Sequence, residues 1–423
     1  MKIAVIGAGW SGLAAAVRAT EAGQSVTVFE MAAQPGGRAR ELQVEGLALD
    51  NGQHILIGAY RETLALMRTL GVDVDASFDR RPLELRYPDG RGLRLPRGPA
   101  ALVFALGVAS ARGWNWRDKL ALLRAAAGWA LAGFECAPGT SVDTLCRGLP
   151  PAVRELMIDP LCVAALNTPA AQADAAVLLR VLKDALFGGA GGADLLLPRR
   201  SLGGLLPTPA LAWLQARGAA VHLGRRVQQL QAADGPGWRV DAEHFDQVVL
   251  ACSAAEAARL TQTIAPGWAA QAQALRYEPI VTVYLRAPGA RLAAPMMALV
   301  EGPAAPAQFA FDHGALGASP GIFAFVASGA QAWVDQGLEA TAAAVLQQAQ
   351  LAFPAGTWPQ APTVLRCVAE KRATFRCTPG LQRPRATIAA GLVAAGDYVA
   401  GPYPATLEGA VRAGTAAARA ASR

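Results

Sequence analysis

Long apolar runs are missing from this chain of 423 residues, although 53% of its residues are hydrophobic. No stretch reaches the roughly 18 to 20 apolar residues of a membrane-spanning helix, so we expect no transmembrane segment. Histidine is scarce, with four scattered residues, and the six cysteines form no C-x-x-C pair. These absences argue against a metal site and a disulfide framework, and they favour free thiols in a reducing, cytoplasmic compartment.

Charged residues are also few, at 17% of the chain. So low a charge content beside so many apolar residues excludes an intrinsically disordered protein, and neither a G-x-y period nor sustained heptads indicate a fibrous one. The length exceeds what one hydrophobic core usually holds, which predicts two or three structural units in a globular protein.

The positive charge is concentrated in one segment. Residues 80–124 contain ten Arg and Lys against three acidic residues, an excess equal to the net charge of +7 of the whole chain. Inside this segment lies the uncharged run Pro99–Ala111, which is flanked by arginines and followed by two tryptophans. This pattern predicts that residues 97–116 dip into one anionic leaflet, on the inner face of the cytoplasmic membrane. The alternative is a core helix with solvated arginines; a nucleic-acid partner is not expected, because its groove would interleave basic and aromatic residues.

The chain opens with a strand, a turn, a helix and a second strand. Lys2–Ile6 reads as a buried strand, residues 13–22 as an Ala-rich helix, and Ser25–Phe29 as the second strand. The turn before the helix has the spacing G-x-G-x-x-G, and Glu30 follows its third glycine by 18 residues. This combination predicts a Rossmann-type dinucleotide-binding unit.

Residues of this unit have separate physical tasks. Gly7 allows the tight turn, Gly9 lets the backbone approach a pyrophosphate, and Gly12 lets the helix pack closely on the strand. Ser11 lies at the helix N-terminus, where free N–H groups favour a phosphate. Glu30 is placed to accept hydrogen bonds from ribose hydroxyls. We therefore predict that these five residues bind the cofactor.

A second glycine-rich loop follows almost directly. Gly36, Gly37 and Arg38 place further backbone N–H groups and a fixed positive charge beside a phosphate. A NAD enzyme has no evident use for such a loop, so the loop favours FAD over NAD. The alternative is a simple glycine turn.

The C-terminal segment resembles the closing segment of the flavin amine oxidase and carotenoid desaturase superfamily. Residues 391–395 read as a short strand, which is followed by Gly396-Asp397, a Gly/Pro-rich turn and a helix. The resemblance implies that Gly396 and Asp397 bind the ribityl chain of FAD. It also implies that residues 408–411, beginning with Glu408 near the start of the closing helix, lie near the isoalloxazine, and that Thr406 is a further cofactor contact.

Two internal segments fit the same superfamily. Residues 224–227 resemble the strand whose valine backbone contacts the adenine, which assigns that contact to Val227. Residues 246–251 look like the returning strand of the nucleotide domain. Because the resemblance covers both ends and the middle of the chain, it implies that FAD is the cofactor.

Three further segments look like the squalene-associated flavoproteins, the hydroxysqualene dehydroxylases of bacterial hopanoid pathways. They are Asp-Asn-Gly-Gln-His within 49–64, Leu-Asn-Thr-Pro within 159–169, and Leu-Leu-Leu-Pro-Arg at 195–199. Plant-type carotene desaturases carry a related G-x-H-x-x-x-G-x-Y run, so part of the first segment does not separate the two families. The resemblance implies that reduced FAD converts hydroxysqualene to squalene and water, with Asn51 and Gly52 at the cofactor.

Such a reaction needs a proton donor, because an allylic alcohol leaves as water only when its hydroxyl is protonated. It also needs a dry apolar tunnel beside the flavin. We predict His54 or Asp50 as the donor, since the strand that carries them should pass close to the flavin. Asn167 and Asp159, polar groups in an apolar helical region, are second choices. The alternatives are a structural role for His54 and a helix-end carboxylate for Asp159.

These placements predict an α/β fold with a Rossmann-type FAD-binding domain and an inserted α+β substrate domain, like that of amine oxidases and phytoene desaturases. The FAD-binding domain is expected to combine residues 1–75, 200–275 and 375–423. Residues 76–199, helical and rich in Ala and Leu, and residues 276–374, with strand-like runs, are expected to form the substrate domain.

Two other functions stay open on the sequence. The first is an FAD-dependent desaturase or oxidase that acts on a polyprene, a carotenoid or an amine. The second is a non-catalytic escort that binds a prenyl lipid on the same fold and has lost the flavin. The intact glycines of both loops, together with Glu30 and Asp397, argue against that loss.

Overall fold

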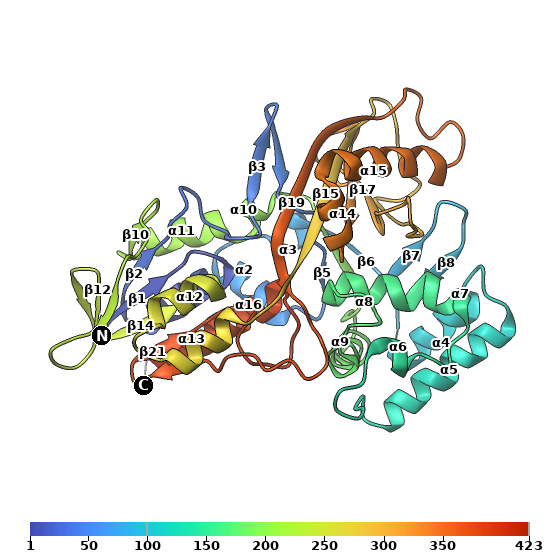
Figure 1. Ribbon diagram of the computed structural model, residues 1–423. Coiled ribbons are helices and arrows are strands. Elements are labelled where there is room, and N and C mark those ends of the chain that lie inside the picture. The colour runs from blue at the N-terminus through green and yellow to red at the C-terminus, as the bar shows by residue number, and fades with distance from the viewer. Residues whose placement is uncertain (99, 422–423) are drawn as a thin grey trace.

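The computed structural model describes residues 1–98 and 100–421. Figure 1 shows a sheet near both chain termini, a second sheet with helices against it, and a group of helices at the far end of the molecule. No helix within the two described ranges is long and apolar enough to cross a membrane.

The first sheet contains six strands: β1 (Lys2–Ile6), β2 (Ser25–Phe29), β10 (Ala220–His222), β14 (Gln247–Leu250), β20 (Thr387–Ala389) and β21 (Leu392–Ala394). Their order is β10-β2-β1-β14-β21-β20, and only β20 runs antiparallel to its neighbour. A parallel sheet is normally covered on both faces, which explains why the central strands are buried apolar runs. Three separate stretches of the chain therefore build one Rossmann-type sheet.

Helices α1 (Trp10–Glu21) and α16 (Leu407–Ala421) pack against each other beside this sheet. Small residues allow the close approach, since a Cβ atom on Gly414 would lie 2.0 Å from the carbonyl oxygen of Ser11. The sequence predicts a helix from residue 13, whereas α1 begins at Trp10. The reason is that Gly9 takes an extended backbone (φ −73°, ψ 175°) and acts as the N-cap.

Shorter elements surround this sheet and connect it to the rest of the molecule. Those that follow β2 are β3 (Glu41–Val44), β4 (Leu47–Asp50), β5 (Leu56–Ile57), α2 (Arg61–Thr69) and α3 (Val74–Ser77). Those between the helical group and the second sheet are α10 (Leu202–Leu205), α11 (Pro207–Gln215), β11 (Leu230–Ala232), β12 (Trp238–Val240), β13 (Glu243–Phe245), α12 (Ala254–Thr261) and α13 (Pro266–Gln273).

The second sheet is antiparallel and consists of β16 (Met296–Ala298), β17 (Phe309–Asp312), β18 (Ile322–Ala327), β15 (Tyr277–Arg286) and β19 (Thr363–Phe375), in that order. Helices α14 (Gln331–Gln336) and α15 (Leu338–Ala352) lie against it (Figure 1). Strand residues alternate between two faces. Val281 and Val283 belong to the core shared with α15, whereas Tyr284 belongs to the core of the opposite face. That opposite face is turned toward the rest of the molecule.

The third part is mainly helical. It contains α4 (Ala100–Ser110), α5 (Trp116–Leu131), α6 (Val142–Leu145), α7 (Pro151–Val153), the π-helical turn η1 (Arg154–Ile158), α8 (Asp159–Leu166) and α9 (Ala175–Phe187). The segment predicted as helical also holds four short strands, β6 (Phe78–Arg81), β7 (Glu84–Arg86), β8 (Gly92–Arg94) and β9 (Leu195–Pro198). The strands β5, β9 and β6 form one small sheet, so the helical part is attached to the nucleotide part by backbone pairing.

Candidate functional site

The two predicted phosphate loops lie against each other. Gly9 pairs with Gly36 in an isolated β-bridge, and a Cβ atom on Gly37 would lie 3.3 Å from the Cα atom of Gly9. Within the first loop, a Cβ atom on Gly12 would lie 1.9 Å from the carbonyl oxygen of Gly7, whose φ is +113°. Backbone alone therefore forms this cradle, because side chains would fill it.

The N-terminus of α1 opens into the same cradle. Its N-cap Gly9 offers no side-chain cap, so the first N–H groups of the helix need another acceptor. The Ser11 hydroxyl is buried and has no hydrogen-bond partner among residues 1–98 and 100–421. Uncapped N–H groups and a nearby hydroxyl suit a phosphate.

Glu30 lies at the end of β2, beside the first loop. One carboxylate oxygen accepts from the N–H of Ala8 at 2.7 Å and the other from the N–H of Ala32 at 2.8 Å. The carboxylate thus fixes the backbone on both sides of the cradle. Its predicted contact with ribose hydroxyls remains a prediction.

Arg38 and Asp397 join the second loop to the C-terminal segment. A nitrogen of the guanidinium lies 2.6 Å from a carboxylate oxygen of Asp397, and another donates to the carbonyl of Ala373 at 2.8 Å. Burial lowers the pKa of Arg38, but the ion pair with Asp397 outweighs burial and leaves that pKa raised. A permanent positive charge therefore lies at the cradle.

Tyr398 follows Asp397 directly in the C-terminal segment. Its side chain is buried, and its hydroxyl has no hydrogen-bond partner in the described part of the chain. Burial raises the pKa of this phenol, as does the nearby Cys252 thiol. Because an unpaired buried hydroxyl is costly, Tyr398 is a further candidate contact for a ligand in the cradle.

Thr406 and Glu408, the predicted flavin contacts at the start of α16, make different hydrogen bonds. Thr406 accepts from the N–H of Gly409 at 3.0 Å and so caps the helix. The carboxylate of Glu408 accepts from the N–H of Thr63 at 2.9 Å and from that of Glu62 at 3.1 Å. It thereby supplies the acceptors that the first turn of α2 needs, since α2 has no side-chain cap of its own. Only the backbone of Glu408 remains for a flavin contact.

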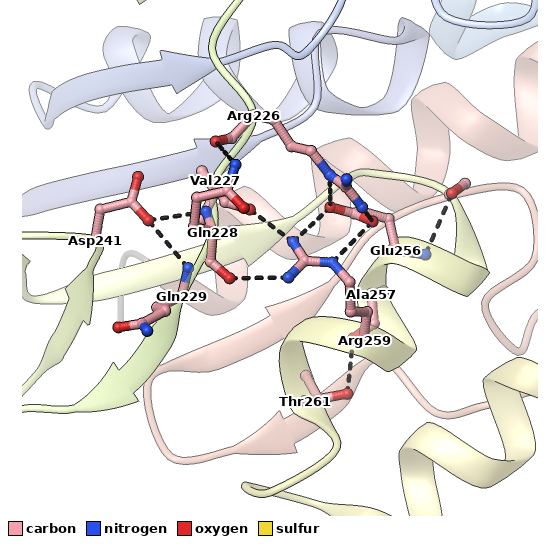
Figure 2. A network of polar contacts seen from close by, with 10 residues as sticks. Arg226, Val227, Gln228, Gln229, Asp241, Glu256, Ala257, Arg259 and Thr261 are labelled. Atoms are coloured by element: carbon pink, nitrogen blue, oxygen red, sulfur yellow. Dashed lines mark hydrogen bonds and ion pairs between the residues drawn. The ribbon is translucent and has the colours of Figure 1, made fainter.

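Residues 224–227, expected as a strand, form a loop between β10 and β11. Figure 2 shows what holds this loop: the carboxylate of Glu256 lies between the guanidinium groups of Arg226 and Arg259. Arg259 also donates to the carbonyl of Val227 at 2.6 Å. Side chains from α12 thus replace a strand ladder. The backbone of Val227 was predicted to contact the adenine, but its carbonyl oxygen already accepts a hydrogen bond from Arg259.

Asp50 and the residues after it lead from β4 toward the second sheet. The Asp50 carboxylate is 7% exposed, and one of its oxygens accepts from the N–H of Leu202 at 2.9 Å. Burial raises the pKa of Asp50 to about 7; the Leu202 hydrogen bond opposes this and nearby Glu41 adds to it. Asn51 is buried and accepts from the N–H of Arg40 at 3.2 Å. Asp50 can therefore be protonated at neutral pH.

The pKa of His54 is shifted in the opposite direction to that of Asp50. Its Nδ1 lies 2.7 Å from the carbonyl oxygen of Gly52, which can only accept, so Nδ1 carries the proton. Burial lowers the pKa of His54; the Gly52 bond opposes this, and the charge of Arg38 lowers it further. A neutral ring in this tautomer leaves Nε2 as an acceptor. This state counts against the prediction of His54 as the proton donor.

The second sheet places polar groups opposite these residues. Tyr284 of β15 donates to the carbonyl of Asp50 at 2.8 Å, and its ring meets the ring of His313 edge to face. A ring nitrogen of His313 lies 3.1 Å from the side-chain oxygen of Gln53. The hydroxyl of Thr282 is buried as well. Strand alternation could have indicated Thr282 and Tyr284, but only the fold shows what they face.

The second-choice candidates lie elsewhere. The amide of Asn167 donates to the carbonyl of Glu278 at 3.1 Å and to the hydroxyl of Thr374 at 3.0 Å, while its oxygen accepts from the N–H of Gly329 at 2.7 Å. Asn167 thus connects α8 to the second sheet, with its amide engaged on both sides. Asp159 begins α8, and burial raises its pKa. Within residues 1–98 and 100–421, no hydrogen bond or ion pair joins it to Asp50 or His54.

The sequence of this chain is similar to known flavoproteins over nearly its full length. The family model of the flavin containing amine oxidoreductases matches residues 10–422. The chain belongs to this family. It is 32% identical to the hydroxysqualene dehydroxylase of Rhodopseudomonas palustris, over 98% of this chain and 96% of that protein. The hydroxysqualene dehydroxylase of Sinorhizobium fredii is 27% identical over the same shares of the two chains. The resemblance of nearly the whole chain to hydroxysqualene dehydroxylases, predicted from the motifs, is confirmed.

Solved structures show the same fold. An oxidoreductase from Methanosarcina mazei superposes with a TM-score of 0.73 at 18% identity, covering 98% of this chain and 99% of that one. Cyclohexylamine oxidase from Brevibacterium oxydans superposes with a TM-score of 0.70 at 18% identity, covering 100% and 98%. The predicted fold class, a Rossmann-type FAD-binding domain with an inserted α+β domain, is confirmed.

As a flavin containing amine oxidoreductase, the protein is an FAD-dependent oxidoreductase. Its residues fit FAD: two backbone-walled loops, uncapped N–H groups, a fixed guanidinium and the unpaired hydroxyls of Ser11 and Tyr398 surround one cradle. No group of three or more His, Cys, Asp or Glu residues in the described ranges could hold a metal ion.

Proposed function

We propose that this protein reduces hydroxysqualene to squalene and water, a step in the supply of squalene for hopanoid synthesis. The observation that carries the proposal is its identity of 32%, over nearly the full length, to a protein named hydroxysqualene dehydroxylase. In contrast, the phytoene desaturase of Cereibacter sphaeroides is 39% identical over only 20% of this chain and 17% of its own. A desaturase or oxidase therefore remains the second candidate.

The reaction breaks a C–O bond and forms a C–H bond at an allylic carbon. Reduced FAD, when bound, supplies the electron pair as hydride. The chain must supply a proton to the departing hydroxyl. It must also keep water from the allyl cation that remains when the hydroxyl leaves as water. Asp50, with a pKa of about 7, is our candidate for the proton source, since half of it is protonated near neutral pH.

Hydrocarbon must be held beside these polar groups. A small cavity in the helical part has an almost wholly apolar lining, which comes from Phe104, Ala126, Trp129, Phe134, Met157, Ile158, Leu161, Leu178, Leu182 and Leu186. Ligand sites are commonly apolar with few polar groups that set orientation. We propose that this cavity lies on the path of the isoprenoid chain.

The outer face of the same helices supports the proposed membrane contact. Leu102 and Leu106 of α4 are 56% and 49% exposed, and Trp116 at the start of α5 is 68% exposed. Arg112 and Arg117 are exposed beside them. Exposed apolar residues flanked by basic ones are typical of surfaces that contact anionic lipid. We propose that this edge takes the water-insoluble substrate from a membrane.

Anaerobic reduction of the purified protein tests the proposed reaction. Hydroxysqualene is added to the reduced enzyme while the visible flavin absorbance is recorded and products are extracted. Return of the oxidised flavin spectrum together with squalene is the expected result. A flavin that stays reduced, with hydroxysqualene recovered unchanged, would rule out the dehydroxylase and favour the desaturase or oxidase. A protein that binds no flavin even with added FAD would contradict both.

A further inference from the structure

Thr282 carries a hydroxyl that the protein does not use. Its side chain is 0% exposed at the middle of β15, and its Oγ1 has no hydrogen-bond partner among the described residues. Its ladder neighbours are Val326 on β18 and Val368 on β19, whose side chains cannot accept or donate a hydrogen bond. A buried hydroxyl without a partner is destabilising relative to a valine of the same shape. Its presence points to a ligand.

The hydroxyl faces Gly52. A Cβ atom built on Gly52 would lie 3.7 Å from Oγ1 of Thr282 and 3.8 Å from Cε1 of His54. One point in space is therefore within contact distance of both side chains. Cε1 is bonded to both ring nitrogens, and Nδ1 is already engaged by the Gly52 carbonyl. The remaining polar group of the ring is Nε2, an acceptor, which is bonded to Cε1 and lies more than 4 Å from the built Cβ atom.

Gly52 keeps this point open. Its φ is not positive, so the backbone does not require glycine here. A methyl group would meet no heavy atom closer than 3.7 Å, so packing does not require glycine either. A side chain at this position would contact both Thr282 and His54.

We infer that Thr282 Oγ1 and His54 Nε2 together bind the hydroxyl of an allylic alcohol substrate. The Thr282 hydroxyl donates to the alcohol oxygen, and the alcohol donates its own proton to Nε2. This inference rests on the proposed function, whose substrate it orients. Squalene has no oxygen, so the product loses both hydrogen bonds and is released. Thr282 is thus a specificity-determining residue.

Binding to the oxidised enzyme tests the inference without turnover, because oxidised FAD has no hydride to give. Dissociation constants are measured for hydroxysqualene and for squalene in detergent micelles, from the change in flavin absorbance. Thr282→Val is compared with Thr261→Val, which removes an equally buried hydroxyl that bonds within its own helix, to the Ala257 carbonyl. We expect Thr282→Val to weaken hydroxysqualene binding about tenfold. Squalene binding, FAD content and the Thr261→Val constants should stay unchanged.

Three other outcomes decide against the inference, and a fourth separates it from the proposed function. Equal affinity of the unaltered enzyme for hydroxysqualene and squalene would show that no group of the protein binds the alcohol. An alcohol preference that survives in Thr282→Val would assign it to other residues. Loss of FAD from Thr282→Val would assign the hydroxyl to the cofactor. If the preference depends on Thr282 but the reduced enzyme makes no squalene, the proposed reaction fails and the alcohol site stands.

Gly52→Ala provides a second, independent variant. The added methyl group should crowd an alcohol oxygen bound to Thr282 and His54, and so reduce the preference for hydroxysqualene at least as much as Thr282→Val does. Gly128→Ala, on α5, is the matched control because a Cβ atom there meets nothing within 4 Å. Gly52→Ala that keeps both FAD and the alcohol preference would overturn the placement of the alcohol.

Discussion

The proposed cofactor side and the proposed substrate side of this molecule treat polar groups in opposite ways. At the cofactor side, charges are densely paired: Arg38 with Asp397, and Glu256 with Arg226 and Arg259. On the substrate side, the wall contributed by β15 carries few polar groups, and the hydroxyl of Thr282 has no partner among the described residues. Pairing fixes the backbone that binds a constant cofactor, whereas an unpaired group in an apolar wall can select a substrate.

The largest effect should come from breaking the backbone cradle. In Gly12→Ala, the new Cβ atom would lie 1.9 Å from the Gly7 carbonyl oxygen, so the loop must move. We expect no bound FAD after purification and a free energy of unfolding lower by about 3 kcal/mol. Visible absorbance and denaturant unfolding measure the two effects. Gly267→Ala, in α13, meets nothing within 4 Å and should behave as the unaltered protein.

Asp50→Asn tests whether the Asp50 carboxyl group donates the proton to the departing hydroxyl. The amide oxygen can still accept from Leu202, so FAD should stay bound while kcat falls about 100-fold. In the unaltered enzyme the acid form is needed, and it disappears as pH rises through about 7. Single-turnover rates from pH 5 to 9 should therefore fall on the alkaline side. An Asp50→Asn enzyme with full activity would remove Asp50 from the reaction.

The exposed edge of the helical part is the proposed membrane contact of the substrate side. The double variant Leu102→Asp, Leu106→Asp should reduce sedimentation with phosphatidylglycerol vesicles at least tenfold, because two apolar contacts are replaced by negative charge. Leu351→Asp changes a leucine of α15 that is even more exposed, at 77%, and this variant should bind as before. Equal loss in both variants would indicate a general charge effect rather than a contact surface.

The smallest effect is expected in the network of Figure 2. Burial raises the pKa of Glu256, but the hydrogen bonds from Arg226 and Arg259 outweigh it and lower that pKa to about 2. A lowered folded-state pKa stabilises the protein above the usual glutamate value and loses this effect as pH falls toward 2. Glu256→Gln should cost about 1 kcal/mol at pH 7 and flatten stability between about pH 4.5 and 2. Glu21→Gln, in the exposed pair with Arg18, should change neither.

Much of the fold could be predicted because its signals are local. The strands Lys2–Ile6 and Ser25–Phe29 lie where the sequence predicts them, and the closing helix α16 follows the Gly/Pro-rich turn as expected. Residues 224–227 were expected as a strand, and this was wrong. The Arg259 side chain holds the carbonyl of Val227, and the Asp241 carboxylate holds the N–H of the next residue, Gln228; no local pattern reveals either contact.

The candidate site divides along the same line. The glycine spacing and the acid of the first 30 residues determine a dinucleotide cradle, because each residue answers a need of its own backbone. Glu408 shows the limit of motif transfer, since its carboxylate serves α2.

The sequence by itself thus determined the family and the cofactor, and it predicted the cradle proposed to bind it. Only the tertiary structure decided that Thr282 of β15 meets the Gly52–His54 turn, and that His54 is neutral with Nε2 as acceptor. Strand periodicity tells which residues share a face, but it cannot tell what lies across from that face. Burial and distance set the ionisation of Asp50 and His54, and both arise only when distant segments pack together.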